Sequence, residues 1–136
     1  MTLTVTVLSR EVIYQSADFR LTGQHDSHSS PKITQLHFSW FLGIVTYSGL
    51  GSYNYKDVSS LIAEWLTGVP DLSIGEAAEL LQARGTQLVA EVRRDGGGLW
   101  PMTFVLAGFE DNRPPIVYIA SNCENIRREQ YPLSRH

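Results

Sequence analysis

The stretch SIGEAAELLQARGTQLVAEVRR, residues 73–94, carries the longest helical pattern in this 136-residue chain. Ser73 and Glu76 form a capping-box pattern, in which each side chain satisfies a backbone N–H of the other at a helix start. Its apolar positions recur at helical spacing: Ala77, Leu80, Leu81, Leu88, Val89 and Val92. The pattern predicts an amphipathic helix that tolerates Gly85 in its interior and ends before Gly96.

A shorter helix is expected just upstream, over residues 55–67. Its apolar side chains also fall at helical spacing: Val58, Leu61, Ile62, Trp65 and Leu66. Gly68 and Pro70 follow and predict its end. We therefore expect two consecutive helices in the middle of the chain.

Strand patterns precede the helices. Residues 2–8 alternate Thr with Val or Leu, which is the period of a half-buried strand with its Thr side chains facing outward. Residues 11–17 form a second β-prone run, so a hairpin turning at Ser9-Arg10 is expected. Residues 22–31 are polar and predict a loop, and residues 33–37 and 38–47 predict another pair of strands.

Two more strands are expected after the helices, at residues 103–109 and 116–120, with turn-forming residues between them. The order is four strands, two helices and two strands. A block order of this kind favours an α+β fold with antiparallel sheets over an alternating parallel sheet. No repeat or linker divides the chain, so residues 1–136 are expected to form a single domain.

Composition excludes several classes of function. The net charge of −3 and the lack of any Lys/Arg run argue against nucleic-acid and membrane-surface binding. Cys123 is the only cysteine, so no internal disulfide can form. The N-terminus lacks signal-peptide features, and no apolar run is long enough to span a membrane. We expect a soluble, cytoplasmic protein.

Four local motifs occur on consecutive expected elements: Ser16-Ala17-Asp18-Phe19-Arg20 with Thr22, Lys32-Ile33-Thr34-Gln35-Leu36, Ser48-Gly49-Leu50-Gly51, and Phe104 to Tyr118. In this order they resemble the proteasome β-type family of N-terminal-nucleophile hydrolases, over most of residues 2–121. The resemblance implies a layered sandwich of antiparallel sheets with the two helices on one face.

The resemblance also implies a set of site residues. In that family an N-terminal Thr is the nucleophile and its free α-amine is the base. Thr2 corresponds to this nucleophile, and Asp18 and Lys32 to the groups that tune it. Arg20 corresponds to the support of Asp18, and Gly49 to the backbone N–H that polarises the carbonyl. The resemblance therefore implies a threonine-type peptidase or amide hydrolase that becomes active once Met1 is removed.

The sequence also departs from the family. Met1 precedes Thr2, and counterparts of the family's later Ser and Asp, of its last strands and of its two outer helices are missing. We therefore expect a shortened sandwich whose uncovered apolar sheet associates with other copies, as a dimer or ring, or with a related subunit. This favours a non-catalytic or degenerate assembly protein, with a peptidase acting on a peptide substrate as the alternative.

Each site residue also has an ordinary structural interpretation. Thr2 fits one more outward-facing Thr of an alternating strand, and Asp18 with Arg20 fits an exposed ion pair. Lys32 follows a Pro at a strand start, where solvated lysines are common, and Gly49 fits turn geometry.

The remaining motifs predict no cofactor and no metal. His25-Asp26-Ser27-His28 has usable zinc ligands, but only His37 lies nearby as a third, so a polar loop is favoured. Gly96-Gly97-Gly98 follows a helix, whereas a phosphate-binding loop precedes one. We expect Cys123 to be a packing residue and the aromatic residues Phe38, Trp40, Phe41 and Trp65 to lie in the core.

Overall fold

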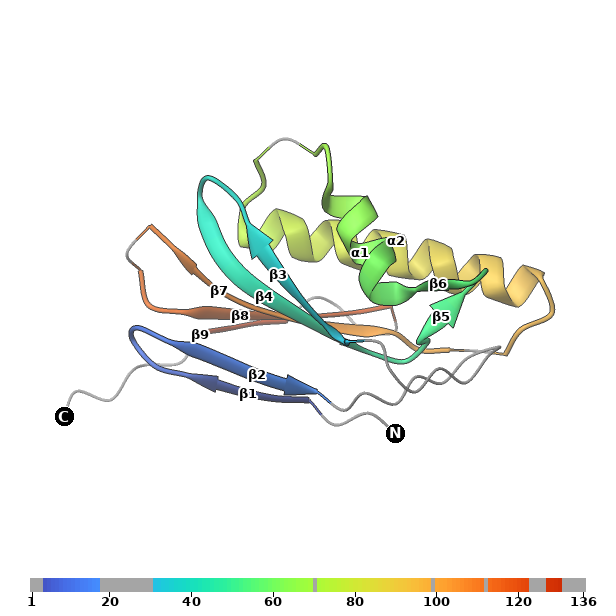
Figure 1. The fold of residues 1–136 in the computed structure, drawn as a ribbon, viewed down its shortest axis with the longest axis horizontal. Helices are drawn as coiled ribbons and strands as arrows, with labels where there is room; N and C mark the ends of the chain where they lie inside the picture. Colours follow the sequence, from blue (N-terminus) through green and yellow to red (C-terminus); the bar gives the residue numbers. More distant parts are fainter. Residues whose placement is uncertain are drawn as a thin grey trace.

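A computed structural model describes residues 4–17, 31–69, 71–98, 100–111, 113–122 and, for the backbone, 127–130. The fold is α+β with antiparallel sheets and two helices, as the sequence predicted. Figure 1 shows three layers: the helices lie over one face of the large sheet, and a β-hairpin lies against its other face.

The large sheet has five antiparallel strands in the order β3-β4-β7-β8-β9. They are β3 (Ile33–His37), β4 (Phe41–Ser48), β7 (Thr103–Glu110), β8 (Ile116–Ser121) and β9 (Arg127–Gln130). The first four confirm the predicted strands, although β4 begins three residues later than expected because Ser39 and Trp40 form the turn. The strand β9 was not predicted.

The N-terminal hairpin forms a separate two-stranded sheet from β1 (Thr4–Leu8) and β2 (Ile13–Ala17). The predicted two-residue turn at Ser9-Arg10 is wrong, because the turn occupies residues 9–12. Ser9 donates its N–H to Val12 O at 2.8 Å, and Val12 N–H donates to Ser9 Oγ at 2.9 Å. The side chain of Ser9 thus closes a wider turn.

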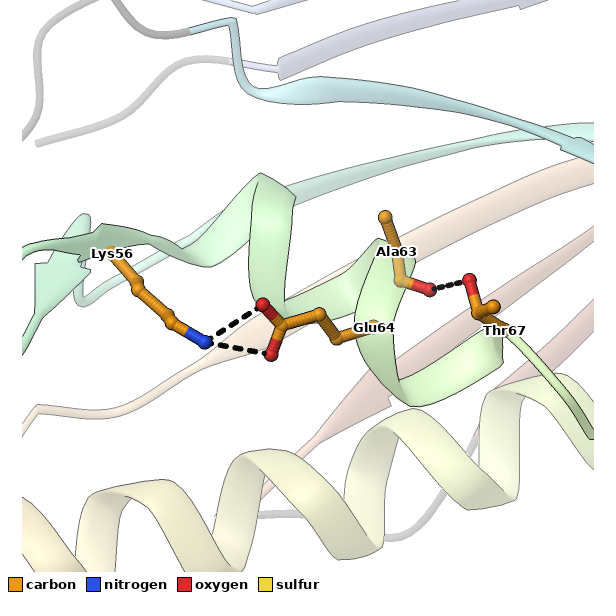
Figure 2. A network of polar contacts seen from close by, with 4 residues as sticks. All are labelled: Lys56, Ala63, Glu64 and Thr67. Atoms are coloured by element: carbon orange, nitrogen blue, oxygen red, sulfur yellow. Dashed lines mark hydrogen bonds and ion pairs between the residues drawn. The ribbon is translucent and has the colours of Figure 1, made fainter.

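The first helix, α1 (Val58–Leu66), follows a short unpredicted ribbon of β5 (Ser52–Tyr53) and β6 (Lys56–Asp57). Lys56 Nζ lies 2.8 Å from Glu64 Oε1, and Thr67 Oγ1 donates to Ala63 O at 2.6 Å; Figure 2 shows both contacts. The ion pair is more than half exposed and therefore contributes little to stability. Burial of Val58, Ile62 and Leu66 holds α1 on the sheet.

The second helix, α2 (Ile74–Arg94), confirms the predicted helix to within one residue. Its capping box is present, since Glu76 N–H donates to Ser73 Oγ at 3.2 Å and Ser73 N–H donates to Glu76 Oε2 at 2.7 Å. These hydrogen bonds to Ser73 lower the pKa of Glu76. The first turn is fixed by its own side chains, as expected of this motif.

The core lies between the helices and the large sheet. Alternate residues of β4 point into it, so Phe41, Val45 and Tyr47 are buried. Phe38 and Trp65 are half-buried and pack against this core. The prediction that Trp40 is a core residue is wrong: it lies in the β3–β4 turn and is 58% exposed.

Gly85 is the point of closest approach between α2 and the sheet. A Cβ at this position would lie 2.7 Å from Cε2 of Phe104, whose ring is fully buried in β7. Glycine normally destabilises a helix interior relative to alanine. Here it persists because the Phe104 ring fills the space that a methyl group would need.

We therefore predict that Gly85→Ala destabilises the protein by roughly 1–3 kcal/mol, because overpacking outweighs the better helix propensity of alanine. Chemical denaturation measures the change. In a Phe104→Leu background the same substitution should cost less, since the smaller side chain leaves room for the methyl group. An increase in stability in the wild-type background would contradict this packing.

Candidate functional site

The hairpin meets the large sheet through the side chain of Gln15. Its Nε2 donates to Val105 O, on the central strand β7, at 3.1 Å, and to Thr6 Oγ1 on the neighbouring hairpin strand at 3.2 Å. One side chain therefore ties both hairpin strands to the middle of the sheet, on the face opposite the helices (Figure 1).

The orientation of the hairpin corrects one expectation. Thr4 and Thr6 are half-buried and face the sheet, while Val5 and Val7 point outward. The expectation of outward-facing Thr residues along this strand is therefore wrong for these two. The reason is the register, which places Thr6 opposite Gln15 on the side that bonds to β7.

Two buried polar atoms mark the space between the layers. Thr46 is fully buried in β4, on the face opposite the helices, and its Oγ1 has no hydrogen-bond partner among the described residues. Oε1 of Gln15 is also buried, and it too has no hydrogen-bond partner among the described residues. An unsatisfied buried polar atom costs about 1–3 kcal/mol, and such atoms are uncommon without a functional reason.

Lys32 lies immediately before β3 and is 3% exposed. The interpretation of Lys32 as a solvated strand-end lysine is therefore wrong. Lysine is almost never this buried unless its charge is compensated. Its neighbour in the chain, Ile33, pairs with Thr46, so Lys32 lies at the end of β3 that is nearest to this unpaired hydroxyl.

Gly49 follows β4 at the same end of the β3–β4 pair. Its φ of 109° is in the left-handed region, and a Cβ would lie 2.1 Å from Pro101 O. The backbone thus requires glycine here for steric reasons alone. Loss of activity on replacing Gly49 would not by itself demonstrate an oxyanion role.

The other three predicted site residues, Thr2, Asp18 and Arg20, lie outside the described residues, as do His25-Asp26-Ser27-His28 and Cys123. Thr4 and Ala17, the nearest described neighbours of Thr2 and Asp18, pair with each other at the open end of the hairpin. In Figure 1 this end and the beginning of β3 lie on the same side of the molecule.

Tyr47 is a buried ionisable residue next to Thr46, near this end of β4. Burial, together with the Asp57 carboxylate, raises the pKa of Tyr47 to about 12. A smaller contribution from Ser59 lowers this pKa. Its hydroxyl is buried and makes no hydrogen bond of good geometry with the described residues. The neutral form of Tyr47 is thus strongly favoured in the folded chain.

We predict that the wild-type protein loses stability between pH 10 and about 12, because Tyr47 ionises near pH 10 when unfolded and near pH 12 when folded. The shift of about two pKa units corresponds to roughly 3 kcal/mol. Tyr47→Phe should remove this loss and leave stability at neutral pH equal or higher.

The measurement is the free energy of unfolding against pH for the wild type and Tyr47→Phe. Tyr14→Phe is the matched control, because it removes the hydroxyl of an exposed tyrosine in place of a buried one. Parallel curves for the wild type and Tyr47→Phe would show that Tyr47 is not shielded as described.

Sequence reasoning missed Gln15 and Thr46 as members of this site. Both are polar residues inside β-prone runs: Gln15 lies on the inward face of β2, and Thr46 lies on the face of β4 that points away from the helices. The alternation of side chains along each strand is present in the sequence, but it can be interpreted only once the orientation of the hairpin is known. Local periodicity does not supply that orientation.

No group of three or more potential ligand side chains capable of holding a metal ion occurs within the described ranges. Of the helices placed by the structure, none is both long and apolar enough to cross a membrane. Comparisons of the chain with protein-family profiles, with curated proteins and with solved structures give no match.

Proposed function

We propose that this chain is an N-terminal-nucleophile-hydrolase-like domain that acts as a non-catalytic assembly protein and associates with copies of itself. The observation that supports this best is the outer face of the β1–β2 hairpin. The side chains on this face alternate with those that contact the large sheet, and three of the four on the two strands are apolar or aromatic, the fourth being Ser16.

Val5, Val7 and Tyr14 form the apolar part of this face and are 48%, 55% and 65% exposed. Val7 and Tyr14 lie directly opposite each other in the hairpin register, and Val5 is two residues away on the same side. A contiguous exposed apolar surface of this kind marks an interaction site more often than chance exposure does. Covering it would contribute on the order of 1 kcal/mol per side chain.

The chemistry of the hairpin favours a second copy as the partner. Neither strand contains a charged residue, so two hairpins related by a two-fold axis meet without repulsion. Flat sheet faces also pack well against each other. The three side chains alone fall short of a stable interface of about 800 Å² per partner, so neighbouring surface must contribute as well.

Charge variants of Val7 test this proposal. We predict that Val7→Lys and Val7→Glu are each monomeric by light scattering, because identical charges would face each other across the two-fold axis. Mixing the two should restore association, since opposite charges then meet. Tyr55→Asn is the matched control: it removes an equally apolar, 93% exposed side chain from the β5–β6 ribbon and should not change the mass.

A monomeric wild-type protein at high concentration that also fails to bind a hydrophobic dye would contradict the proposal. If both charge variants still associate, the interface lies outside the outer face of the hairpin.

Threonine-type peptidase activity is the second candidate, and the burial of Lys32 favours it. A buried lysine at the start of β3 lies at the end of the β3–β4 pair that also carries Gly49. On this candidate Thr2 attacks a peptide carbonyl, its α-amine accepts the hydroxyl proton, and water then releases the ester. A nearby Lys cation would favour the neutral amine that this step requires.

The peptidase candidate predicts loss of Met1 from protein made in its native host, detected by intact mass. It also predicts covalent labelling by a threonine-directed inhibitor that Thr2→Ala abolishes. Thr4→Ala should label normally, since Thr4 is inside β1 and has no free amine. Retained Met1, or labelling that does not depend on Thr2, would leave only the assembly role.

A further inference from the structure

Among the described residues, the outer edge of β3 is unpaired. This strand ends the order β3-β4-β7-β8-β9, and no described strand pairs with its outer side. Figure 1 shows it at the margin of the sheet, beside α1. Natural proteins usually protect such edges with charged residues or proline. The five residues of β3, Ile-Thr-Gln-Leu-His, include no Lys, Arg, Asp, Glu or Pro.

The register shows which backbone groups are free. Phe38 N–H donates to Phe41 O at 2.9 Å, which makes this a hydrogen-bonded pair. Hydrogen-bonded pairs alternate with non-hydrogen-bonded pairs in an antiparallel ladder, so Leu36 and Thr34 also bond toward β4. Three residues therefore turn their N–H and C=O groups to the open edge: Ile33, Gln35 and His37.

A groove lies on each side of this edge. On the hairpin side, a hollow of about 210 Å³ is lined by Ile13, Leu42, Gly43 and Ile44 and by Gln35 and His37 of β3 itself. On the helix side, a hollow of about 400 Å³ between β3 and the end of α1 includes Leu66 and Asp71. An added strand would place its successive side chains alternately in these two grooves.

The grooves differ in chemistry. The hairpin-side groove is mostly apolar. In the helix-side groove, Asp71 is the one acidic side chain, and its Oδ1 accepts the Ser39 N–H at 3.2 Å. That hydrogen bond holds the carboxylate in place at the groove. A ligand strand that fits both grooves has apolar residues on one side and a basic residue on the other.

We propose that the β3 edge binds an extended peptide segment by strand addition, with apolar side chains in the hairpin-side groove and a lysine or arginine facing Asp71. This inference does not depend on the proposed function, because it uses a different surface from the outer face of the hairpin. The net charge of −3 also favours a basic segment.

A second copy of the chain fits this edge poorly. If two β3 strands paired, Gln35 and His37 of one copy would lie against Ile13, Leu42 and Ile44 in the hairpin-side groove of the other, where their polar groups would lose water. Leu36 could not fill the helix-side groove of its partner, because it is buried in its own core. The side chains around the β3 edge therefore favour a peptide over a second copy of the chain as the added strand.

The direct test is amide hydrogen exchange by NMR with a short acetylated and amidated peptide that alternates valine with lysine. The amides of Ile33, Gln35 and His37 should exchange quickly in the free protein and slowly with the peptide. Those of Thr34 and Leu36 should be protected in both states, because they bond to β4.

Variants at Gln35 and Asp71 sharpen the test. Gln35→Pro removes the outward N–H without removing a bond to β4, and should weaken binding about tenfold. Gln35→Thr keeps the N–H and should bind as the wild type does. Asp71→Asn keeps an acceptor for Ser39 N–H but should abolish the preference for the lysine peptide over one that alternates valine with glutamine.

If Gln35→Pro does not fold, N-methylation of the peptide amides that face β3 tests the same hydrogen bonds, and it should abolish binding to the wild-type protein. Binding that tolerates N-methylation would overturn the proposal. So would protection of the Gln35 amide that rises with protein concentration and needs no peptide, because this would identify a second copy as the occupant.

Discussion

The hydrogen bond from Gln15 to Val105 O fixes which face of the hairpin meets the sheet. In a β-strand one face cannot be turned inward without turning the other outward. Once Gln15 and Thr6 are bonded between the layers, Val5, Val7 and Tyr14 must face away from the sheet. The apolar outer surface is thus a direct consequence of a polar inner contact.

Each face of the hairpin carries apolar side chains. Burial of apolar area is the main term that stabilises folding. Turning the hairpin over would bury two valines and a tyrosine, but it would expose Leu8, Ile13 and Ala17, which now face the sheet. The observed orientation instead leaves Gln15 Oε1 and Thr46 Oγ1 buried without partners in the described part of the chain. Within the described part of the chain, this orientation thus combines unpaired polar atoms between the layers with exposed apolar side chains on the outer face.

The same orientation shapes the open edge of β3. Ile13 alternates with Tyr14 along β2, so it faces the sheet and lines the hairpin-side groove together with Leu42. A hairpin turned over would place Tyr14 there and close the hollow. The surface proposed for self-association and the groove proposed for peptide binding therefore both follow from which face of the hairpin meets the sheet, although they lie on different sides of the hairpin.

Local signals in the sequence were enough to locate both helices and most strands. The capping box at Ser73 and the apolar face of α2 are satisfied within a few residues, so they can be recognised without tertiary contacts. The positions of Trp40 and Lys32 were misjudged, because the exposure of a turn residue and the burial of a strand-end lysine depend on the neighbouring layer.

For the candidate site, two of the residues that the sequence suggested, Lys32 and Gly49, lie at one end of the β3–β4 pair, and their roles stay predictions. The sequence did not reveal that Gly49 packs against Pro101, a contact between segments about fifty residues apart in the chain. Nor did it reveal Gln15, whose role depends on a strand ninety residues away. Contacts of this range follow from the layer order, which periodicity alone does not determine.

The most direct test of this account is an NMR measurement of nuclear Overhauser effects between the hairpin and the large sheet. The account predicts contacts from the side-chain amide protons of Gln15 to Val105 and none from Val7 or Tyr14 to β4 or β7. Contacts from Val7 and Tyr14 to those strands, with Gln15 exposed to solvent, would show the hairpin turned over and would contradict the account.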